Sequence, residues 1–278
     1  MIIFVGSACI LVLAVLFGGY FTDIPEEDGV QLGSGKMFDK IAEYYDGMNT
    51  IMSLNQHMTW KNQLVDTMNL RASDRILDLA TGTGDIALLQ AHRYRYMLAD
   101  AMNHEKREDI SELMNRVIIT GMDPSRNMLE KAVAKSNELG HHDVVDFTEG
   151  NAMHLDHIGD NTFSKISMSF GIRNVEDRNK ALLEMRRVLM KKEFKTNSDH
   201  SLYIMEFVRP TEGYLAPLVS AFIEYIIPAL GAFAEDYSCV KSFFIHLMLI
   251  IASFPFCSLL YCQATFAPLA ACHRNINT

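Results

Sequence analysis

The sequence predicts an α/β fold with a doubly wound, mostly parallel sheet. Short apolar runs with the length of buried parallel strands alternate with segments whose apolar residues repeat at helical spacing. The first run, "RILDLA" (75–80), leads directly into a glycine-rich turn and then into a helical segment. Alternating units of this size place a ligand at the carboxyl ends of the strands.

Two kinds of segment precede the first strand. Residues 22–36 are acidic and then rich in Gly and Ser, which predicts a linker. Residues 37–68 carry apolar residues at helical spacing with a break near 53–55, which predicts two helices. After the strand, "GDIALLQAH" (84–92) continues as a helix. The polar stretch 92–115 is longer than a normal strand-to-helix connection, so we expect an inserted surface loop there.

The remainder of the domain repeats the alternation of strand and helix. Pro124 and Ser125 at one end and Gly140 at the other mark a helix that follows the second strand. The remaining predicted elements are strands at 116–123, 144–150, 163–172 and 201–208 and a helix at 176–191.

Composition and charge argue against several classes of function. The formal net charge is −9 and no run of Lys and Arg is longer than two, so the chain offers no broad cationic surface to a nucleic acid. No cysteine occurs between residues 10 and 238, which argues against a disulfide framework or a zinc site in the central domain. A group of histidines near Asp156 lies in loops at mixed spacing, which predicts solvated turns and no metal site; these are His141, His142, His154 and His157.

Both ends of the chain are apolar. Residues 2–21 carry no charge and come close to the roughly 20 apolar residues that a membrane-spanning helix needs. A membrane anchor, a cleaved signal and an artefact of the chosen start codon are the alternatives there. A second run, 243–262, is interrupted by Pro255, and both a membrane span and a stray translated segment stay open. The predicted organisation is an apolar segment 1–21, a linker 22–36, a central domain 37–238 and a divergent apolar segment 239–278.

The glycine loop "LDLATGTGDIA" (77–87) does not by itself identify a ligand. Gly82 and Gly84 stand between a strand and a helix, where small residues let the backbone approach a ligand closely. With Ala87 in third place, the loop also fits the G-x-G-x-x-A pattern of dinucleotide sites.

Three polar residues near the strand ends favour S-adenosylmethionine, which has no pyrophosphate and carries a sulfonium. Asp78 lies inside the first strand, from which a carboxylate can orient the loop and meet a cationic ligand end. Asp123 ends the second strand and could accept both ribose hydroxyls, as it equally would for NAD. Asn151 follows the third strand, where an amide can bind an adenine edge. In the alternative interpretation, Asp78 only satisfies backbone donors and Asn151 is a turn residue.

The stretch "SMSFGIRNVEDR" (167–178) places Arg173 and Asn174 where a buried strand ends. Because ligands of a doubly wound sheet bind at the carboxyl ends of its strands, both residues are expected at the ligand edge of the sheet. The alternative is a loop ion pair between Arg173 and Glu176 or Asp177.

The sequence resembles the ubiquinone/menaquinone-biosynthesis C-methyltransferase family over roughly residues 37–238. The combination of Y-D-x-M-N with S-F-G-x-R-N is far more specific than the glycine loop. The residues that carry the resemblance are "FDKIAEYYDGMNTIMSLNQHMTWK" (38–61), "ILDLATGTGD" (76–85), "GMDPSRNML" (121–129), "GNAMHLDHIGDNTFSKISMSFGIRNVEDRNKALLEMRRVL" (150–189), "IMEFVRP" (204–210) and "YIIPALGAFAEDYS" (225–238).

This resemblance implies a class I, Rossmann-like methyltransferase that uses S-adenosylmethionine to methylate a carbon of a polyprenylated benzoquinol or naphthoquinol ring. Tyr45, Asp46 and Asn49 would close over the ring, and Arg173 and Asn174 would face the quinol. The cofactor contacts that it implies are Thr83 with Gly82 and Gly84, Asp123, Asn151, Ala152 and Ser169.

The expected chemistry needs a ring hydroxyl to lose its proton or nearly so. Arg173 is permanently charged and a poor base, so we expect it to stabilise the developing phenolate oxygen. The proton acceptor is expected to be a water held by Asn174 or the carboxylate of Asp46.

The resemblance ends at Ser238, where the family continues with a helix and a last pair of strands that complete the sheet. In this chain we expect those strands to be missing or replaced. That loss favours a non-catalytic scaffold that binds cofactor or prenyl lipid. A methyltransferase for another lipid-like acceptor is a second alternative, against which the "SFGIRN" stretch argues. The expected partners are a polyprenyl quinol and a membrane surface, with a homodimer or a quinone biosynthetic complex left open. For a eukaryotic source, the resemblance implies the matrix side of the mitochondrial inner membrane.

Overall fold

The computed structural model describes residues 35–53, 55–104, 116–191 and 200–206. The predictions for residues 1–21, for most of the linker and for the chain after Glu206, including the missing or replaced C-terminal strands, lie outside these described residues. Within them, no helix is both long enough and apolar enough to cross a membrane.

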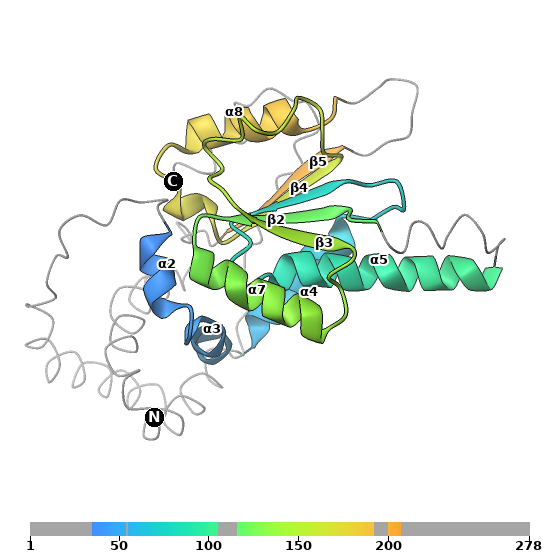
Figure 1. Ribbon diagram of the computed structural model, residues 1–278, viewed down its shortest axis with the longest axis horizontal. Helices are drawn as coiled ribbons and strands as arrows, with labels where there is room; N and C mark the ends of the chain where they lie inside the picture. The colour runs from blue at the N-terminus through green and yellow to red at the C-terminus, as the bar shows by residue number, and fades with distance from the viewer. Residues whose placement is uncertain (1–34, 54, 105–115, 192–199, 207–278) are drawn as a thin grey trace, which may run out of the picture. The chain divides into compact units, whose positions relative to one another are not determined.

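The described residues contain a five-stranded parallel sheet (Figure 1). Its order is β3-β2-β1-β4-β5, and every neighbouring pair is parallel. The doubly wound sheet predicted from the sequence is therefore confirmed. The strands are β1 (Ile76–Leu79), β2 (Ile119–Asp123), β3 (Val145–Glu149), β4 (Lys165–Ser169) and β5 (Ser201–Met205).

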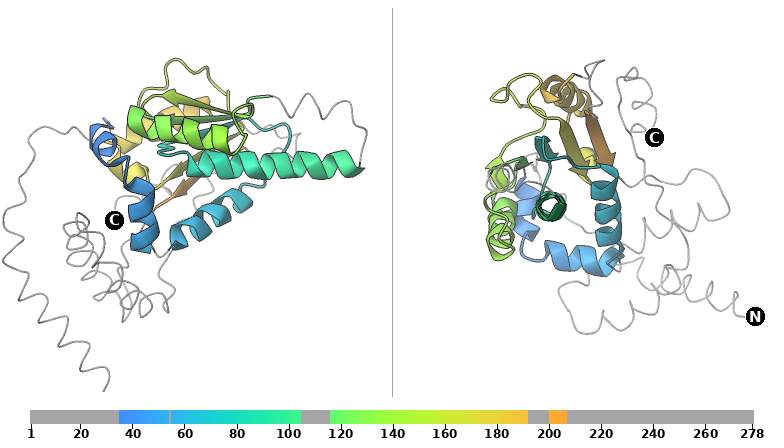
Figure 2. Two further views of the ribbon diagram at one scale, coloured as in Figure 1. Left: turned by 60° about the horizontal axis from the view of Figure 1, so that its bottom comes forward. Right: turned by 90° about the vertical axis from the view of Figure 1, so that its right-hand side faces the viewer.

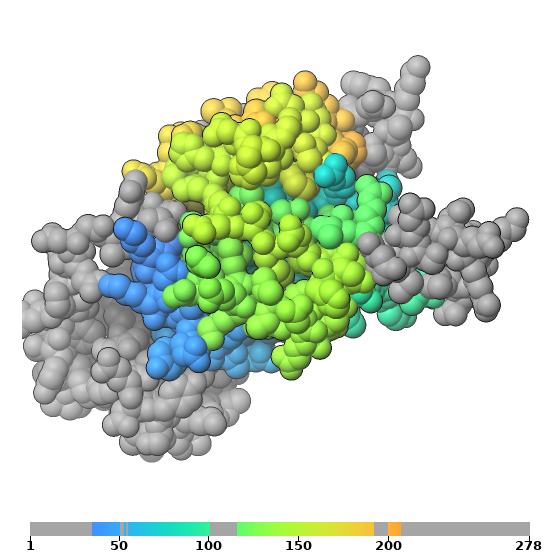
Figure 3. Space-filling view, viewed as in Figure 1, coloured from blue at the N-terminus to red at the C-terminus, as the bar shows by residue number. Residues whose placement is uncertain are grey.

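Helices cover both faces of the sheet (Figures 1 and 2). The last helix, α8, packs on one face, and α4, α5 and α7 pack on the other. Figure 3 shows the blue N-terminal helices beside the green segment that contains α7, in agreement with the contacts between α2 and α7. The helices are α2 (Lys36–Ile41), α3 (Tyr45–Ser53), α4 (Gln56–Thr67), α5 (Asp85–His104), α7 (Arg126–Glu138), α8 (Arg178–Val188) and the short 3-10 helix η1 (Ile172–Asn174).

Side chains alternate between the two faces of each strand, so the sheet has a hydrophobic core on each face. On β5, Leu202 and Ile204 point toward the core beneath α8, whereas Tyr203 and Met205 point toward the core shared with α4 and α5. Such alternation is what a period of two residues produces when both faces are buried. The strand ends are thereby fixed between two helical layers, so the loops that follow them can form a site at the carboxyl edge of the sheet.

The predicted surface loop at 92–115 is wrong over its first half. Helix α5 continues to His104, well beyond the predicted end near residue 92. Within this otherwise polar stretch, Tyr94 and Leu98 continue the helical spacing of Ala91, and all three residues are buried. Their burial offsets the polarity of the intervening residues, so the helix persists.

Two further boundaries differ from the prediction. Three helices precede β1 where two were expected, because the chain also turns between α2 and α3. The predicted break near residue 55 is present, with the backbone of Asn55 in the left-handed region. The fourth strand ends at Ser169 and not at residue 172 because Phe170 has a φ of 54° and turns the chain into η1. The backbone around Arg173 is therefore a helical turn and not the end of a strand.

Candidate active site

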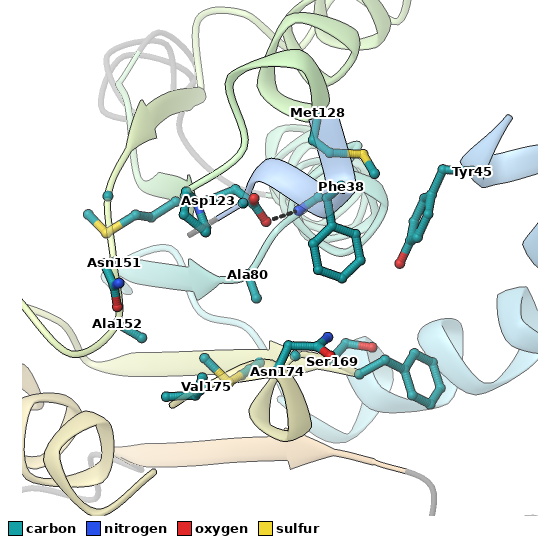
Figure 4. Close-up of a pocket in the computed structure, with 18 residues that line it drawn as sticks. Phe38, Tyr45, Ala80, Asp123, Met128, Asn151, Ala152, Ser169, Asn174 and Val175 are labelled. Atoms are coloured by element: carbon teal, nitrogen blue, oxygen red, sulfur yellow. Dashed lines mark hydrogen bonds between the residues drawn. The ribbon is translucent and has the colours of Figure 1, made fainter. Parts of the chain in front are cut away.

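A pocket lies at the carboxyl ends of β1, β2 and β4, between the sheet and the N-terminal helices (Figure 4). The neighbours β1 and β4 are where the strand order reverses, which is the expected position for a ligand in a doubly wound sheet. The predicted site residues that line it are Tyr45, Gly82, Asp123, Asn151, Ala152, Ser169 and Asn174. Those that do not line it are Asp46, Asp78, Thr83, Gly84 and Arg173.

Two non-glycine residues beside the pocket have left-handed backbone conformations. Ala80 follows β1 with a φ of 51°, and Phe170 follows β4 with a φ of 54°; both line the pocket. Residues other than glycine rarely adopt this conformation, which costs roughly 1–2 kcal/mol each. Strain of this kind at two adjacent strand ends is typical of a functional site.

Asp123 is held in the pocket by the backbone around it. The Gly82 N–H donates to its Oδ2 at 2.8 Å and the Ser125 N–H donates to its Oδ1 at 2.8 Å (Figure 4 draws the first of these). Burial raises the pKa of Asp123, although both N–H groups act in the opposite direction. The glycine loop and the end of β2 are thus tied together, with a carboxylate exposed to the pocket.

Asp78 orients the glycine loop from inside the sheet. Its Oδ2 accepts a hydrogen bond from Thr81 Oγ1 at 2.6 Å, and its Oδ1 accepts one from Ser167 Oγ at 2.6 Å. The Ser167 hydroxyl in turn accepts from Gln90 Nε2 at 2.9 Å. Burial raises the pKa of Asp78 to about 6. The donors are side-chain hydroxyls and not the backbone groups of the alternative interpretation.

The third and fourth strand ends form one wall of the pocket. Asn151 Oδ1 accepts the Met153 N–H at 2.9 Å, so Asn151 is a turn residue and also lines the pocket. The buried hydroxyl of Ser169 has no hydrogen-bond partner among the described residues. Because most buried polar side-chain atoms have a hydrogen-bond partner, this hydroxyl is a candidate to bind a ligand or a water molecule. Figure 4 shows Ser169, Asn174 and Val175 together on this wall.

Arg173 is bound by a residue that the sequence analysis did not single out. Its Nη1 lies 2.8 Å from Glu206 Oε1, at the end of β5, and its guanidinium stacks over the Phe170 ring at 5.9 Å. Asp177, proposed in the alternative interpretation as the partner of Arg173, accepts the Lys180 N–H and caps α8. Arg173 is half exposed at the pocket rim, whereas Asn174 lines the pocket itself.

Of the three predicted lid residues, Asn49 does not line the pocket, and Tyr45 and Asp46 point in different directions. Tyr45 lines the pocket opposite Ser169, and its ring makes an edge contact with Phe38 at 6.2 Å (Figure 4). Asp46 instead binds Thr83 Oγ1 at 2.7 Å and Lys135 Nζ at 2.6 Å, outside the pocket lining. Its carboxylate is therefore engaged, which does not favour Asp46 as the proton acceptor.

Sequence reasoning missed several aromatic and apolar lining residues. Phe38, Met128 and Phe170 line the pocket with Tyr45 and give it an apolar wall. Phe38 and Met128 carry only helical spacing and Phe170 only its place in a predicted strand, and neither signal can separate a lining residue from a core residue. Among the described residues, no group of three or more His, Cys, Asp or Glu could hold a metal ion.

The pocket residues fit S-adenosylmethionine. Asp123 offers two carboxylate oxygens beside a glycine loop, which suits a ribose, and the unpartnered Ser169 hydroxyl offers one more polar contact. The apolar wall suits a planar ring. Among the described residues, no Lys or Arg lines the pocket, whereas a bound pyrophosphate would favour a cation there.

Comparisons with known proteins show similarity to one family over most of the chain. A model of the ubiE/COQ5 methyltransferase family matches residues 26–256. Ubiquinone/menaquinone biosynthesis C-methyltransferase UbiE from Hydrogenovibrio crunogenus is 34% identical over 220 residues, which cover 78% of this chain and 74% of the relative. Demethylmenaquinone methyltransferase from Anoxybacillus flavithermus is 31% identical over 203 residues, which cover 73% and 74%.

Proposed function

The chain belongs to the ubiE/COQ5 methyltransferase family, and we propose that it methylates a ring carbon of a polyprenyl benzoquinol or naphthoquinol. As a member of that family it is a methyltransferase whose cofactor is S-adenosylmethionine. The observation that supports the proposed acceptor is the pocket, in which cofactor-binding groups on β1, β2 and β4 face an aromatic wall of Phe38 and Tyr45.

The cofactor, when bound, supplies an electrophilic methyl group on a sulfonium. Asp123 would hold the ribose, and Ser169 and Asn151 would bind from the opposite strand ends. These groups would fix the cofactor relative to the acceptor and exclude water. Positioning and the exclusion of water should supply most of the acceleration of an in-line displacement. Asp78 acts indirectly because it orients Thr81 in the loop.

The acceptor ring must become electron-rich before its carbon can attack. Arg173 would stabilise the oxygen of the ring as its hydroxyl loses a proton, and Glu206 holds the guanidinium in place. A water held by Asn174 is favoured as proton acceptor, since Asp46 is bound to Thr83 and Lys135. The bound cofactor would supply the methyl group to this carbon and leave as the neutral thioether, and the ring C–H proton would then pass to water, which would restore aromaticity.

We further propose that the chain works at a membrane surface, because a polyprenyl acceptor resides in the bilayer. The uncharged run at 2–21 supports this, as does its apolar counterpart at 243–262, and both lie outside the described residues. Co-sedimentation of the full chain with vesicles would test it, and a chain that stays in the supernatant would contradict it.

The decisive experiment measures cofactor binding by the purified full chain and then methyl transfer to short-chain demethylated quinols. Arg173→Ala should lower kcat about a hundredfold, as loss of an oxyanion partner typically does, and should leave cofactor affinity within about threefold. Arg126→Ala is the matched control because Arg126 is exposed on α7 and paired only with Glu130 among the ion pairs seen. Binding without transfer would support the scaffold, and unchanged turnover of Arg173→Ala would refute its assignment.

A further inference from the structure

Five polar and charged side chains form a cluster beside the pocket, which we name the Lys135 cluster. Lys135 Nζ lies 2.6 Å from Asp46 Oδ2, 2.9 Å from Asp85 Oδ1 and 3.0 Å from Thr83 Oγ1. Thr83 Oγ1 donates to Asp46 Oδ1 at 2.7 Å, and Lys61 Nζ binds Asp85 Oδ2 at 2.7 Å. The members come from α3, α4, α5, α7 and the glycine loop.

Lys135 is the central cation of this cluster. All three of its amine hydrogens have an acceptor, and its side chain is 30% exposed. Burial would lower the pKa of Lys135, but the Asp85 and Asp46 carboxylates raise it above the usual value. Asp85 also has Lys61 as a partner, whereas Lys135 is the only cation bound to Asp46 among the ion pairs of the described residues. Removing the Lys135 charge would therefore affect Asp46 more than Asp85.

The contact to Asp46 connects α7 to α3. Asp46 follows Tyr45 in the first turn of α3, and the Tyr45 ring lines the pocket. Thr83, the second partner of Asp46, follows Gly82, whose N–H binds Asp123. A single side chain on α7 thus connects the helix that carries an aromatic wall residue to the loop that approaches the cofactor.

We propose that Lys135 is a positioning residue, which holds α3 against the glycine loop so that Tyr45 stays in the pocket wall. The expected effect of Lys135 on kinetics rests on the proposed function, whereas its expected effect on the position of α3 does not. Without Lys135, the Asp46 carboxylate keeps a single neutral hydrogen bond, and α3 should open more often. Tyr45 would then leave the acceptor side of the pocket while Asp123 and Ser169 stay in place.

The chain provides a matched control one turn earlier on α7. Lys131 binds Glu43, just before α3, at 2.9 Å, and thus also connects α7 to the N-terminal helical region. The Glu43 side chain is 73% exposed, compared with 41% for Asp46. Exposed pairs contribute little to stability, so Lys131→Met should change α3 much less than Lys135→Met does.

Hydrogen exchange of the full chain tests the proposal without any substrate. Lys135→Met should raise exchange at the amides of α3 about tenfold, while exchange in α8, on the other face of the sheet, stays near the wild-type rate. Lys135→Arg, which keeps the charge, should recover most of the protection. If the methionine variant fails to fold, Asp46→Asn replaces it, since that change removes the same charge pair. Unchanged exchange in α3, or equal effects at Lys131 and Lys135, would overturn the proposal.

Kinetics provide the second measurement. Lys135→Met should lower kcat/KM for the quinol about tenfold or more and change cofactor affinity by less than about threefold. A loss of cofactor affinity equal to the loss of kcat/KM would contradict the positioning role. If the wild-type chain transfers no methyl group to any quinol, the proposed function fails, and hydrogen exchange alone decides on Lys135.

Discussion

Replacing Asp78 with Asn should stabilise the folded chain at neutral pH. Asp78 is 1% exposed and lies beneath the glycine loop, where burial raises the pKa of its carboxyl from 3.8 to about 6. A raised carboxyl pKa means that ionisation is less favourable in the folded chain than in the unfolded chain. The neutral amide of Asn avoids this cost. It can still accept from Ser167 and donate to Thr81, whose hydroxyl can rotate.

The size of the effect follows from the pKa values. The shift from 3.8 to about 6 is roughly two units, which at about 1.4 kcal/mol per unit corresponds to about 3 kcal/mol. Between about pH 4 and pH 6 the folded chain keeps a proton that the unfolded chain has released. The contribution of Asp78 to the free energy of unfolding therefore falls as pH rises through this window and stays low above it.

Urea unfolding of both proteins at a series of pH values measures this directly. The stability of Asp78→Asn relative to wild type should grow by about 2.4 kcal/mol between pH 4 and pH 7.5, because the unfolded carboxyl is already partly ionised at pH 4, and the m-value should not change. Asp146→Asn, which alters an exposed carboxylate on β3, should give a difference within about 0.5 kcal/mol throughout. A difference for Asp78→Asn that does not vary with pH would refute the reasoning.

Two further predictions concern the loop and the rim of the pocket. Gly84 has a φ of +84° and an added Cβ would lie 3.0 Å from the Phe147 ring, so Gly84→Ala should lower the free energy of unfolding by about 2–4 kcal/mol in urea titrations. Gly140→Ala, with a φ of +67° and open space, should cost only about 1–2 kcal/mol, and an equal loss at both positions would contradict a steric cause. Glu206→Gln keeps an acceptor for Arg173 but removes the charge, so kcat should fall several-fold in the methyl-transfer assay, less than for Arg173→Ala; no change would remove Glu206 from the mechanism.

The parts of the fold that the sequence predicted depend on short-range patterns. Apolar runs mark β1 and β4 because both strands are buried on two faces, and the glycine loop marks the strand end where a ligand can approach. The same reasoning failed between residues 92 and 104, where the buried Tyr94 and Leu98 are too widely separated among polar residues to mark a helix locally. The spacing of these two residues indicates a helix only when their packing against the sheet and α4 is known.

The partners of the site residues could not be predicted because they depend on tertiary structure. Glu206 is 33 residues from Arg173, and they meet because Ser169 pairs with Met205 in the register of β4 and β5. The strand order would have to be known before that contact could be derived. Lys135 carries even less signal, since a lysine near the end of an amphipathic helix is most often solvated.

The distribution of charge distinguishes between the two ligands that the glycine loop alone left open, S-adenosylmethionine and a dinucleotide. Asp78 and Asp123 both lie at the glycine loop, and burial raises the pKa of each. A pyrophosphate beside two buried carboxylates would be repelled, whereas a sulfonium or an ammonium would favour their ionised forms. Arg173, by contrast, lies in η1 beyond the end of β4, where the proposed mechanism places the acceptor oxygen that becomes negative. Negative charge near the methyl donor and positive charge near the acceptor oxygen is the arrangement that methyl transfer from a sulfonium to a phenolate-like ring requires.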